Sequence, residues 1–338
     1  MTTPTGLDAL GVTFASFMNL GLDAAVQAAG WAADLGYQSF WTAETVGPEA
    51  FSTLTAVGAV APSLDLGTGV LALQLRTPPL VAMAGATLQA LHPDRDIILG
   101  VGISSPVVTS KWHGAPYGER PLARVREYLT LLQECLSGET VSFKGDFYEI
   151  SRFRLGVKLG DRRPKVVIGA LNPGMLRLAG ELADGVLLNY LPASHVPWSV
   201  EQVRAGAEGR ADGPPTVYGY VHAGVCERAD GIDYARRDLF SYAVVDAYAR
   251  NFERAGFGAE IATIRGHHAE GDRDAALAGV SDRMVDAIDV MGDADHVRAT
   301  VASYVDAGID VPVLMPLPWG PDRMGVVEAT MRAAAGRA

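Results

Sequence analysis

The sequence contains little cysteine. Only Cys135 and Cys226 occur, far apart and with no second cysteine at motif spacing near either one. A disulfide framework and a thiolate zinc site both need paired or clustered cysteines, so neither is expected to organise this fold. Such low cysteine usage is typical of a reducing compartment, and we expect a cytoplasmic protein.

Positive charge is scarce as well. The chain has 28 lysine and arginine residues against 39 aspartate and glutamate residues, which gives a formal net charge of −11. Proteins that bind the nucleic-acid backbone usually do so through a broad basic face. We therefore expect no nucleic-acid partner.

Long hydrophobic runs are also missing. No uninterrupted apolar stretch reaches the roughly 20 residues that span a bilayer. The first residues, MTTPTGLDAL, show neither the basic nor the apolar segment of a secretory signal. Hydrophobic residues nevertheless make up 49% of the chain, enough to bury a large core. The sequence thus predicts a globular protein without a membrane partner.

What the sequence does contain is a regular alternation of strand-like and helix-like segments. Strand-like runs lie at 10–17, 37–43, 64–73, 96–104, 165–171, 184–190, 216–226 and 310–316. Most are followed by a helical pattern, which implies parallel pairing with right-handed crossovers. Eight such units in one chain favour an α/β fold of the (β/α)₈ TIM-barrel type, spanning residues 1–338 as a single domain, over an open doubly wound sheet.

Two stretches interrupt the alternation and are predicted to be insertions. Within 139–164, the run TVSFKGDFYEI predicts a β-hairpin that turns at Lys144-Gly145-Asp146. Residues 250–280 are rich in glycine and charge and predict a long loop over the barrel mouth. The pair His267-His268 in this loop lacks the spacing of a helical metal site, and no metal site is expected.

Active sites of TIM barrels lie at the C-terminal ends of the strands, so polar residues there are the candidates. Glu44 and Thr45 follow the second strand, where the carboxylate serves either the site or only a surface loop. Glycines in GTGV, residues 67–70, indicate a packing kink or a close approach to a ligand. His222 and Cys226 near the seventh strand are lone residues, for which packing is the commoner role.

The fourth strand ends in GVGISSP, residues 100–106. This lacks the third glycine of a dinucleotide-binding fingerprint and has no nucleophile elbow. Ser104 and Ser105 are therefore expected as hydrogen-bond donors at the mouth. After the fifth strand, Pro173 is predicted to start a helix and leave the N–H groups of Gly174 and Met175 free, which suits either a phosphate site or a plain tight turn.

These strand ends together resemble the bacterial-luciferase-like superfamily. They are most similar to its coenzyme F420-dependent oxidoreductases, the branch that includes methylenetetrahydromethanopterin reductase. The resemblance is carried, in the family's order within residues 10–190, by FWTAET, LGTGVLALQLRTPP, LGVGISSPVVTSKWHG, RPLARVREYL and VVIGALNPGMLRLAGELADGVLLN.

The resemblance implies a cofactor across the barrel mouth and a cis peptide bond on the third strand, by position Gly69-Val70. It assigns Glu44 to the cofactor ring or its polyol chain. The other residues that it implies in cofactor binding are Gly69, Val70, Ala72, Ile103 and Ser104, with Leu171, Asn172, Gly174 and Met175 around the phosphate. A homodimer is implied by the family habit.

Two departures from the family pattern bear on the reaction. Thr45 stands where luciferases and the sugar-phosphate dehydrogenases have histidine, and Ser105 stands where the dehydrogenase has glutamate. Alcohol oxidation needs a base, and neither hydroxyl is a good one. We therefore predict an F420-dependent reductase that moves hydride to an activated C=C or C=N bond of a small or peptide-like substrate, with Thr45 and Ser105 orienting it.

Two alternatives remain open on the sequence alone. One is a monooxygenase that depends on flavin mononucleotide (FMN) and works with a separate flavin reductase. The other is a catalytically degenerate protein that only binds the cofactor or a partner.

Overall fold

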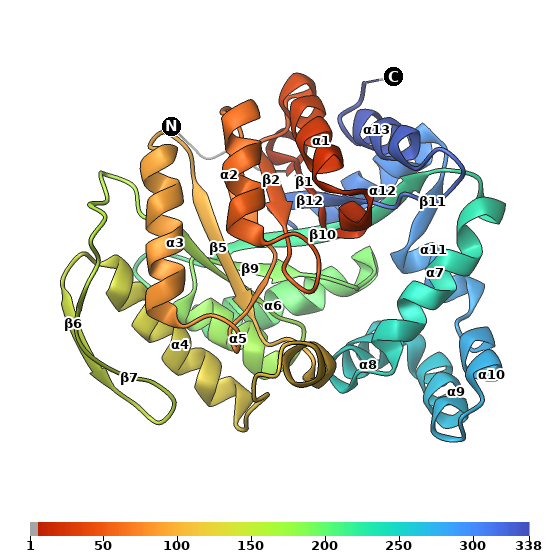
Figure 1. Ribbon diagram of the computed structural model, residues 1–338. Helices are drawn as coiled ribbons and strands as arrows, with labels where there is room; N and C mark the ends of the chain where they lie inside the picture. The colour runs from red at the N-terminus through yellow and green to blue at the C-terminus, as the bar shows by residue number, and fades with distance from the viewer. Residues whose placement is uncertain (1–5, 338) are drawn as a thin grey trace.

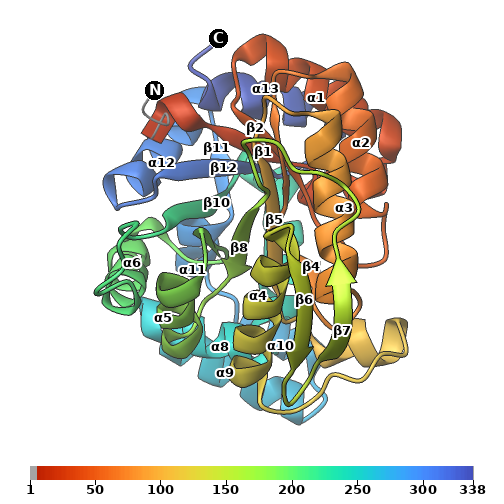
Figure 2. The same cartoon turned by 90° about the vertical axis from the view of Figure 1, so that its left-hand side faces the viewer.

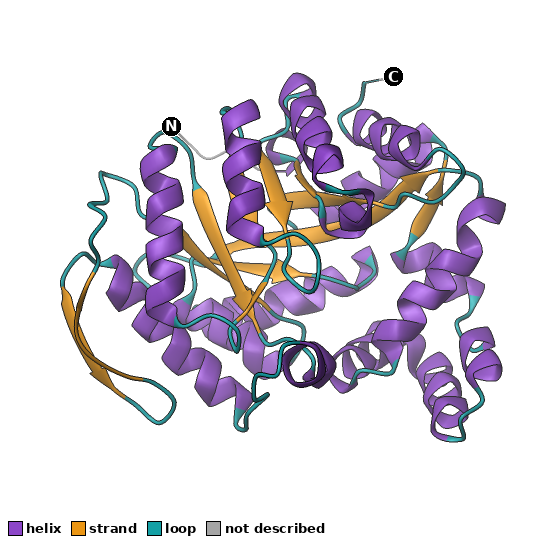
Figure 3. Ribbon diagram, viewed as in Figure 1, coloured by secondary structure: helices purple, strands orange, loops and turns teal. Residues whose placement is uncertain are grey.

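The computed structural model describes residues 6–337, and within them eight parallel strands close into a barrel (Figures 1 and 3). In chain order the barrel strands are β1 (Gly11–Thr13), β2 (Ser39–Thr42), β3 (Asp65–Thr68), β5 (Ile97–Gly102), β8 (Lys165–Gly169), β9 (Gly185–Leu188), β10 (Thr216–Val225) and β12 (Val311–Pro316). The ring closes because β10 pairs with β9 and β12, and β12 pairs with β1. The predicted barrel is confirmed.

Two short strands extend this sheet. β4 (Leu71–Ala72) runs along the end of β5, and β11 (Val290–Gly292) lies beside β10. The stretch 64–73, predicted as one strand, therefore forms two strands, β3 and β4. Between them lies the Gly69-Val70 peptide bond, which is cis.

Helices surround the barrel, as the alternation predicts (Figure 1). They are α1 (Leu22–Leu35), α2 (Ala50–Val60), α3 (Pro78–Leu91), α4 (Pro121–Leu136), α5 (Pro173–Leu182), α6 (Val196–Gly206), α7 (Arg228–Ala243), α12 (Ala294–Asp306) and α13 (Arg323–Ala334). Proline opens α3, α4 and α5, where the first turn needs no N–H. Gly36 ends α1 with φ 82°, a conformation that glycine adopts without strain. None of the helices among residues 6–337 is both long and apolar enough to cross a bilayer.

The core has two layers, because alternate strand residues face opposite sides of the sheet. Between the sheet and the helices lies the larger layer, built largely from alanine, valine and leucine side chains. Inside the barrel, Trp41 packs edge-on against Tyr218 with 5.1 Å between ring centroids. Tyr220 lies in the same inner layer. His222 follows two residues later on β10, so its side chain belongs to the same face.

The predicted hairpin lies outside the barrel as a separate two-stranded sheet (Figure 2). β6 (Thr140–Lys144) pairs antiparallel with β7 (Glu149–Arg154). Glu127 of α4 anchors the turn, since its carboxylate accepts from the backbone N–H groups of Asp146, Phe147 and Tyr148 at 2.6–2.8 Å.

The prediction of a long loop at 250–280 is wrong, because this stretch is mainly helical (Figure 1). It contains the end of α8 (Asp246–Phe252), the π-helical turn η5 (Glu253–Phe257), α9 (Gly258–Ala269) and α10 (Arg273–Ala278), and α11 (Asp282–Ile288) follows. Glycine and charge suggested a loop, but spaced apolar residues decide the structure. Phe252, Phe257, Ile261 and Ile264 are fully buried in a second core with Leu239 of α7.

Candidate functional site

The C-terminal ends of β2, β3 and β5 form one side of the barrel mouth, and Val70 lies just after β3. Its side chain leaves little room for a Cβ on two neighbouring strands: one on Gly102 would lie 3.0 Å from Val70 Cγ2, and one on Gly169 would lie 3.2 Å from Cγ1. These glycines therefore make space for Val70. Val70 and Ile103 remain half-buried, whereas Ala72 is buried.

The glycines of GTGV are explained by packing inside the barrel. A Cβ on Gly67 would lie 2.6 Å from the Trp41 ring, and one on Gly69 would lie 2.0 Å from the Tyr220 hydroxyl oxygen. That hydroxyl donates a hydrogen bond to the Gly69 carbonyl oxygen at 2.9 Å. The Gly69-Val70 bond is cis, as the resemblance predicts by position.

Glu44 is held by Arg76, which is not among the residues predicted from the sequence. Arg76 Nε lies 2.8 Å from one Glu44 oxygen, and its Nη2 lies 2.7 Å from the other. Both side chains are largely buried, and Arg76 also contacts Glu49. The hydrogen bond to Glu44 raises the pKa of Arg76 above its ordinary value. Glu44 is thus an ion-paired carboxylate at the mouth rather than a free base.

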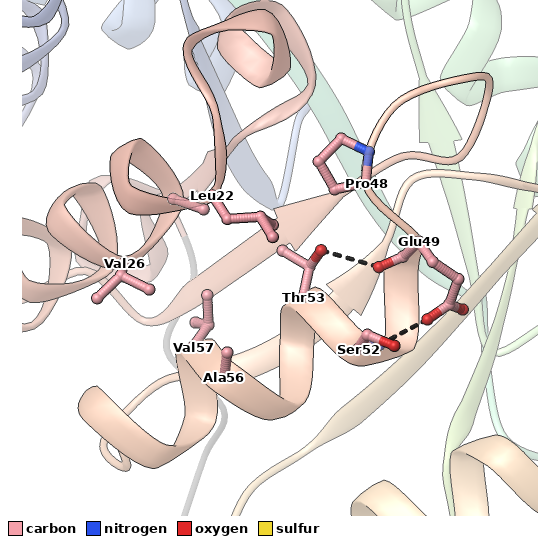
Figure 4. A pocket seen from close by; sticks show the side chains of 9 residues that line it. Leu22, Val26, Pro48, Glu49, Ser52, Thr53, Ala56 and Val57 are labelled. Carbon is pink, nitrogen blue, oxygen red and sulfur yellow. Dashed lines mark hydrogen bonds between the residues drawn. The ribbon is translucent and has the colours of Figure 1, made fainter.

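Glu49 links this ion pair to a small pocket on the outside of the barrel (Figure 4). The pocket lies between α1 and α2 and has mostly apolar walls, made by residues such as Leu22, Val26 and Val57. Glu49 caps α2 by accepting from the N–H groups of Phe51 and Ser52. The pocket is lined by side chains of α1, of α2 and of Pro48 and Glu49 just before α2, and it contains none of the predicted site residues.

Thr45 and Ser105 lie on the loops that follow β2 and β5. The exposed Thr45 contributes its carbonyl oxygen, which lies 2.5 Å from Nε2 of His113. The Ser105 hydroxyl accepts from the Val108 N–H at 3.2 Å, and its carbonyl oxygen accepts from the Thr109 N–H at 3.0 Å. Ser105 thus starts the π-helical turn η3 (Val107–Trp112), which leads to His113. His113 is not among the residues predicted from the sequence.

The N-terminus of α5 is less open than predicted. The Met175 N–H, expected to be free, donates to the Asn172 carbonyl oxygen at 3.0 Å. Asn172 occupies the N-cap position without a side-chain cap, and its amide instead turns toward α8 and η5. The exposed Gly174 keeps its place in the first turn. The half-buried side chains of Leu171 and Met175 flank it.

Arg254 of η5 supplies a cation at this helix terminus. Its Nη2 donates to the Asn172 Oδ1 at 2.6 Å and to the Leu171 carbonyl oxygen at 3.3 Å. The guanidinium lies over the Trp198 ring, 5.2 Å from its centroid. Among residues 6–337 no carboxylate forms an ion pair with it, and burial lowers its pKa from the ordinary value.

His195 completes the surroundings of Arg254. Its ring stacks on Trp198 with 4.9 Å between centroids and an interplanar angle of 19°. Burial, followed by repulsion from Arg254, lowers the pKa of His195 to about 4. The ring is therefore neutral near pH 7, and Arg254 carries the positive charge of this cluster.

The site therefore has the parts that a planar, phosphate-bearing cofactor needs. Val70 and Ile103 offer half-buried apolar surface for a ring, and the Glu44–Arg76 pair adds polar groups beside it. Arg254 and the first turn of α5 offer a partly buried cation and a helix dipole for a phosphate. These residues fit such a group.

The sequence matches one protein family over most of its length. The profile of the luciferase-like monooxygenase family matches residues 5–311. A 5,10-methylenetetrahydromethanopterin reductase of Methanolobus tindarius is 29% identical over 293 residues, covering 85% of this chain and 88% of the relative. A putative coenzyme F420-dependent oxidoreductase of Mycobacterium tuberculosis is 29% identical over 311 residues, covering 84% and 88%.

Solved structures share the fold. The coenzyme F420-dependent tetrahydromethanopterin reductase of Methanopyrus kandleri superposes with a TM-score of 0.80 at 21% identity, covering 99% of both chains. The oxygenating constituent of 3,6-diketocamphane monooxygenase from Pseudomonas putida, in complex with FMN, superposes with a TM-score of 0.67 at 15% identity, covering 99% of both chains.

Proposed function

Because the chain belongs to the luciferase-like monooxygenase family, we propose that it is an F420-dependent oxidoreductase that works as a reductase. The bound deazaflavin would supply hydride to an activated C=C or C=N bond of a small or peptide-like substrate. A relative named as a putative coenzyme F420-dependent oxidoreductase, which aligns over 84% of the chain, supports the cofactor assignment.

The observation that carries the direction of the reaction is the pairing of Glu44 with Arg76. Oxidation of an alcohol needs a base that takes the hydroxyl proton. Both Glu44 oxygens accept from Arg76, so this carboxylate is committed to an ion pair. Reduction of an activated double bond needs no such base. It needs a group that orients the acceptor, and after hydride transfer at most one proton.

The side chains of the mouth then take separate roles. Val70 and Ile103, with Gly69, Ala72 and Ser104 beside them, support the cofactor ring. Glu44, fixed by Arg76, positions its polar edge. Leu171, Asn172, Gly174 and Met175, together with Arg254, bind the phosphate. Thr45 and Ser105 shape the loops against which the substrate lies, and the His113 ring on these loops can return a proton.

Titration of the protein with oxidised F420 and with FMN, followed by cofactor fluorescence, tests the proposal. We expect tight binding of F420 and weak binding of FMN. Reduced F420 should then be oxidised in a single turnover by conjugated alkene or imine acceptors. Tight FMN binding without a response to F420 would instead support an FMN-dependent monooxygenase. This is the second candidate function because one structural relative contains FMN. F420 binding without any turnover would indicate a binding protein.

Glu44→Gln tests the role of the ion-paired carboxylate. We expect it to weaken F420 binding by more than it slows the single-turnover rate, because a neutral amide cannot pair with Arg76. Unchanged affinity with a collapsed single-turnover rate would show that Glu44 acts in the chemistry itself.

We also infer a homodimer that forms through α2 and α3. These two neighbouring helices contain no charged residue, although 20% of the chain is charged. Their outward positions include Val60, Leu80, Met83 and Leu91, each 45–56% exposed. A charge-free apolar surface of this kind suits an identical surface on a second copy. Analytical ultracentrifugation should show a dimer that Met83→Glu converts to monomer, and a monomeric wild type would contradict the inference.

A further inference from the structure

A second group of titratable side chains, two of them buried and one half-buried, lies on the β10 side of the barrel and takes no part in the site described above. It consists of His222 on β10, Asp238 on α7 and Asp289, which directly follows α11. A ligand atom from each lies within 4.8 Å of those of the other two. His222 is 1% exposed and Asp289 is 0% exposed. The three residues come from three separate elements of the fold.

The hydrogen bonds of Asn189 fix the protonation of the His222 ring. Asn189 Oδ1 accepts from the Tyr190 N–H at 2.8 Å, which identifies that atom as the oxygen. The same oxygen lies 2.8 Å from His222 Nε2, so Nε2 must carry a hydrogen and donate it. His222 Nδ1 then faces Asp289 Oδ1 at 2.9 Å. A nitrogen lone pair and a carboxylate oxygen can face each other at this distance only with a cation between them, either a proton or a metal ion.

The two carboxylates also lack a basic partner. Asp289 Oδ2 is fully buried with no hydrogen-bond partner among residues 6–337. In the same described range no lysine or arginine forms an ion pair with Asp238 or Asp289, and Asp238 accepts only from the Tyr190 hydroxyl, at 2.9 Å. Burying two carboxylates without compensation costs several kcal/mol for each ion. The cluster must therefore hold positive charge of its own.

We propose that His222, Asp238 and Asp289 form a binding site for a divalent transition metal of the Zn²⁺ or Mn²⁺ class. One imidazole nitrogen and two carboxylates are ligands that such ions accept. With metal–ligand bonds of about 2.1 Å, adjacent ligand atoms lie about 3.0 Å apart in octahedral geometry and about 3.4 Å apart in tetrahedral geometry. The Nδ1–Oδ1 distance of 2.9 Å is close to the octahedral spacing. The unpartnered Asp289 Oδ2 gives this carboxylate a second ligand atom.

The surrounding hydrogen bonds already orient the ligands as metal sites require. Metal-binding histidines usually donate their other ring N–H to an oxygen, and ligating carboxylates are themselves hydrogen-bonded. His222 Nε2 donates to Asn189, and the Tyr190 hydroxyl holds Asp238. Because His222 and Asp289 are almost fully buried, the metal is structural and ties α7 and α11 to the barrel. This inference does not depend on the cofactor or the substrate.

Metal content and thermal unfolding of the full chain test the site. After removal of any affinity tag, the protein is refolded with Zn²⁺, Mn²⁺ or Co²⁺, dialysed, and analysed by elemental mass spectrometry. We expect about one metal ion per chain, an unfolding midpoint several degrees above that of the chelator-treated protein, and visible Co²⁺ bands of a nitrogen- and oxygen-ligated ion. His222→Gln and Asp289→Asn should lose all three signals.

Asp286→Asn is the matched control. Asp286 lies on α11 near Asp289, but it is exposed and paired with Arg228, so this variant should keep the metal. Wild type that folds but takes up none of the three metals, with an unchanged unfolding midpoint, would overturn the proposal and show that protons alone neutralise the cluster. Uptake that survives both His222→Gln and Asp289→Asn would overturn it as well. If those two variants fail to fold, the wild-type measurements decide.

Discussion

Arg76 and Arg254 lie at two sides of the same barrel mouth, and they differ in what they bind. Arg76 follows β4 and forms ion pairs with Glu44 and Glu49. Arg254 lies beside the start of α5, and its polar and aromatic contacts among the described residues are a carbonyl oxygen, an amide oxygen and the Trp198 ring. Both guanidinium groups are partly buried, yet only one of them has an anionic partner within residues 6–337.

This difference separates a structural cation from a binding one. A buried charge with a partner contributes to the fold, and removing the partner is costly. A buried charge without one remains available for a ligand of opposite sign. We therefore expect Arg76 to act on stability and on the position of Glu44, and Arg254 to act on affinity for an anionic group.

The largest expected effect is that of Arg76→Met. The change leaves the largely buried Glu44 without its cation, and we expect the free energy of unfolding to fall by about 4 kcal/mol. Urea denaturation measures the loss. The control is Arg126→Met, which removes an exposed partner of Glu181 and should cost less than about 1 kcal/mol. Equal losses of unfolding free energy in the two variants would contradict a structural role for Arg76.

A smaller effect concerns pH and the Arg254 side of the mouth. Because the pKa of His195 is lowered to about 4 in the folded state, the unfolded chain takes up this proton first as pH falls below about 6.5. Folding stability should therefore drop on acidification, by about 2 kcal/mol between pH 7 and pH 5 from this group. His195→Gln should lack this part of the pH dependence in urea titrations. Parallel profiles for both proteins would show that the ring takes up its proton as readily in the folded state as in the unfolded chain.

Arg254→Met tests the other half of the comparison. We expect the dissociation constant of F420 to rise about tenfold, since a charge-assisted hydrogen bond to the phosphate is lost, while the free energy of unfolding changes by less than about 1 kcal/mol. Arg250→Met removes the same charge from an exposed position one turn earlier and should leave affinity nearly unchanged. A stability loss like that of Arg76→Met, with unchanged affinity, would erase the distinction between the two arginines.

The smallest effect is expected for Ser105→Ala. The hydroxyl accepts from the Val108 N–H, much as a helix N-cap does, so its loss should cost about 1 kcal/mol of stability. The single-turnover rate should stay within a factor of about two if Ser105 only positions its loop. A large drop in that rate, with stability unchanged, would indicate that Ser105 takes part in the reaction.

The barrel could be predicted from sequence because its signals are local. Alternating strand and helix patterns report burial along the chain, and strand ends mark the mouth whatever their partners are. Ion pairs are different. Arg76 meets Glu44 across 32 residues, and nothing in either segment specifies the other. His222 was similarly unremarkable alone, since its cluster draws on three distant elements.

Arg254 was missed for another reason. It lies in the stretch taken for a loop, where Gly256 adopts φ 96°. The glycine marks an interruption within a helical region rather than the absence of helix. Buried apolar residues on both sides, Phe252 and Phe257, are the signal that could have corrected the prediction.

The contact between His113 and the Thr45 carbonyl oxygen has a consequence for engineering this mouth. The loops after β2 and β5 meet through backbone at position 45, so their contact places no demand on the side chain there. That side chain is exposed and can be exchanged while the loops stay together. Position 45 is thus a natural place to install a new acid or base, and Thr45→His is the first substitution to try when converting this scaffold toward alcohol oxidation.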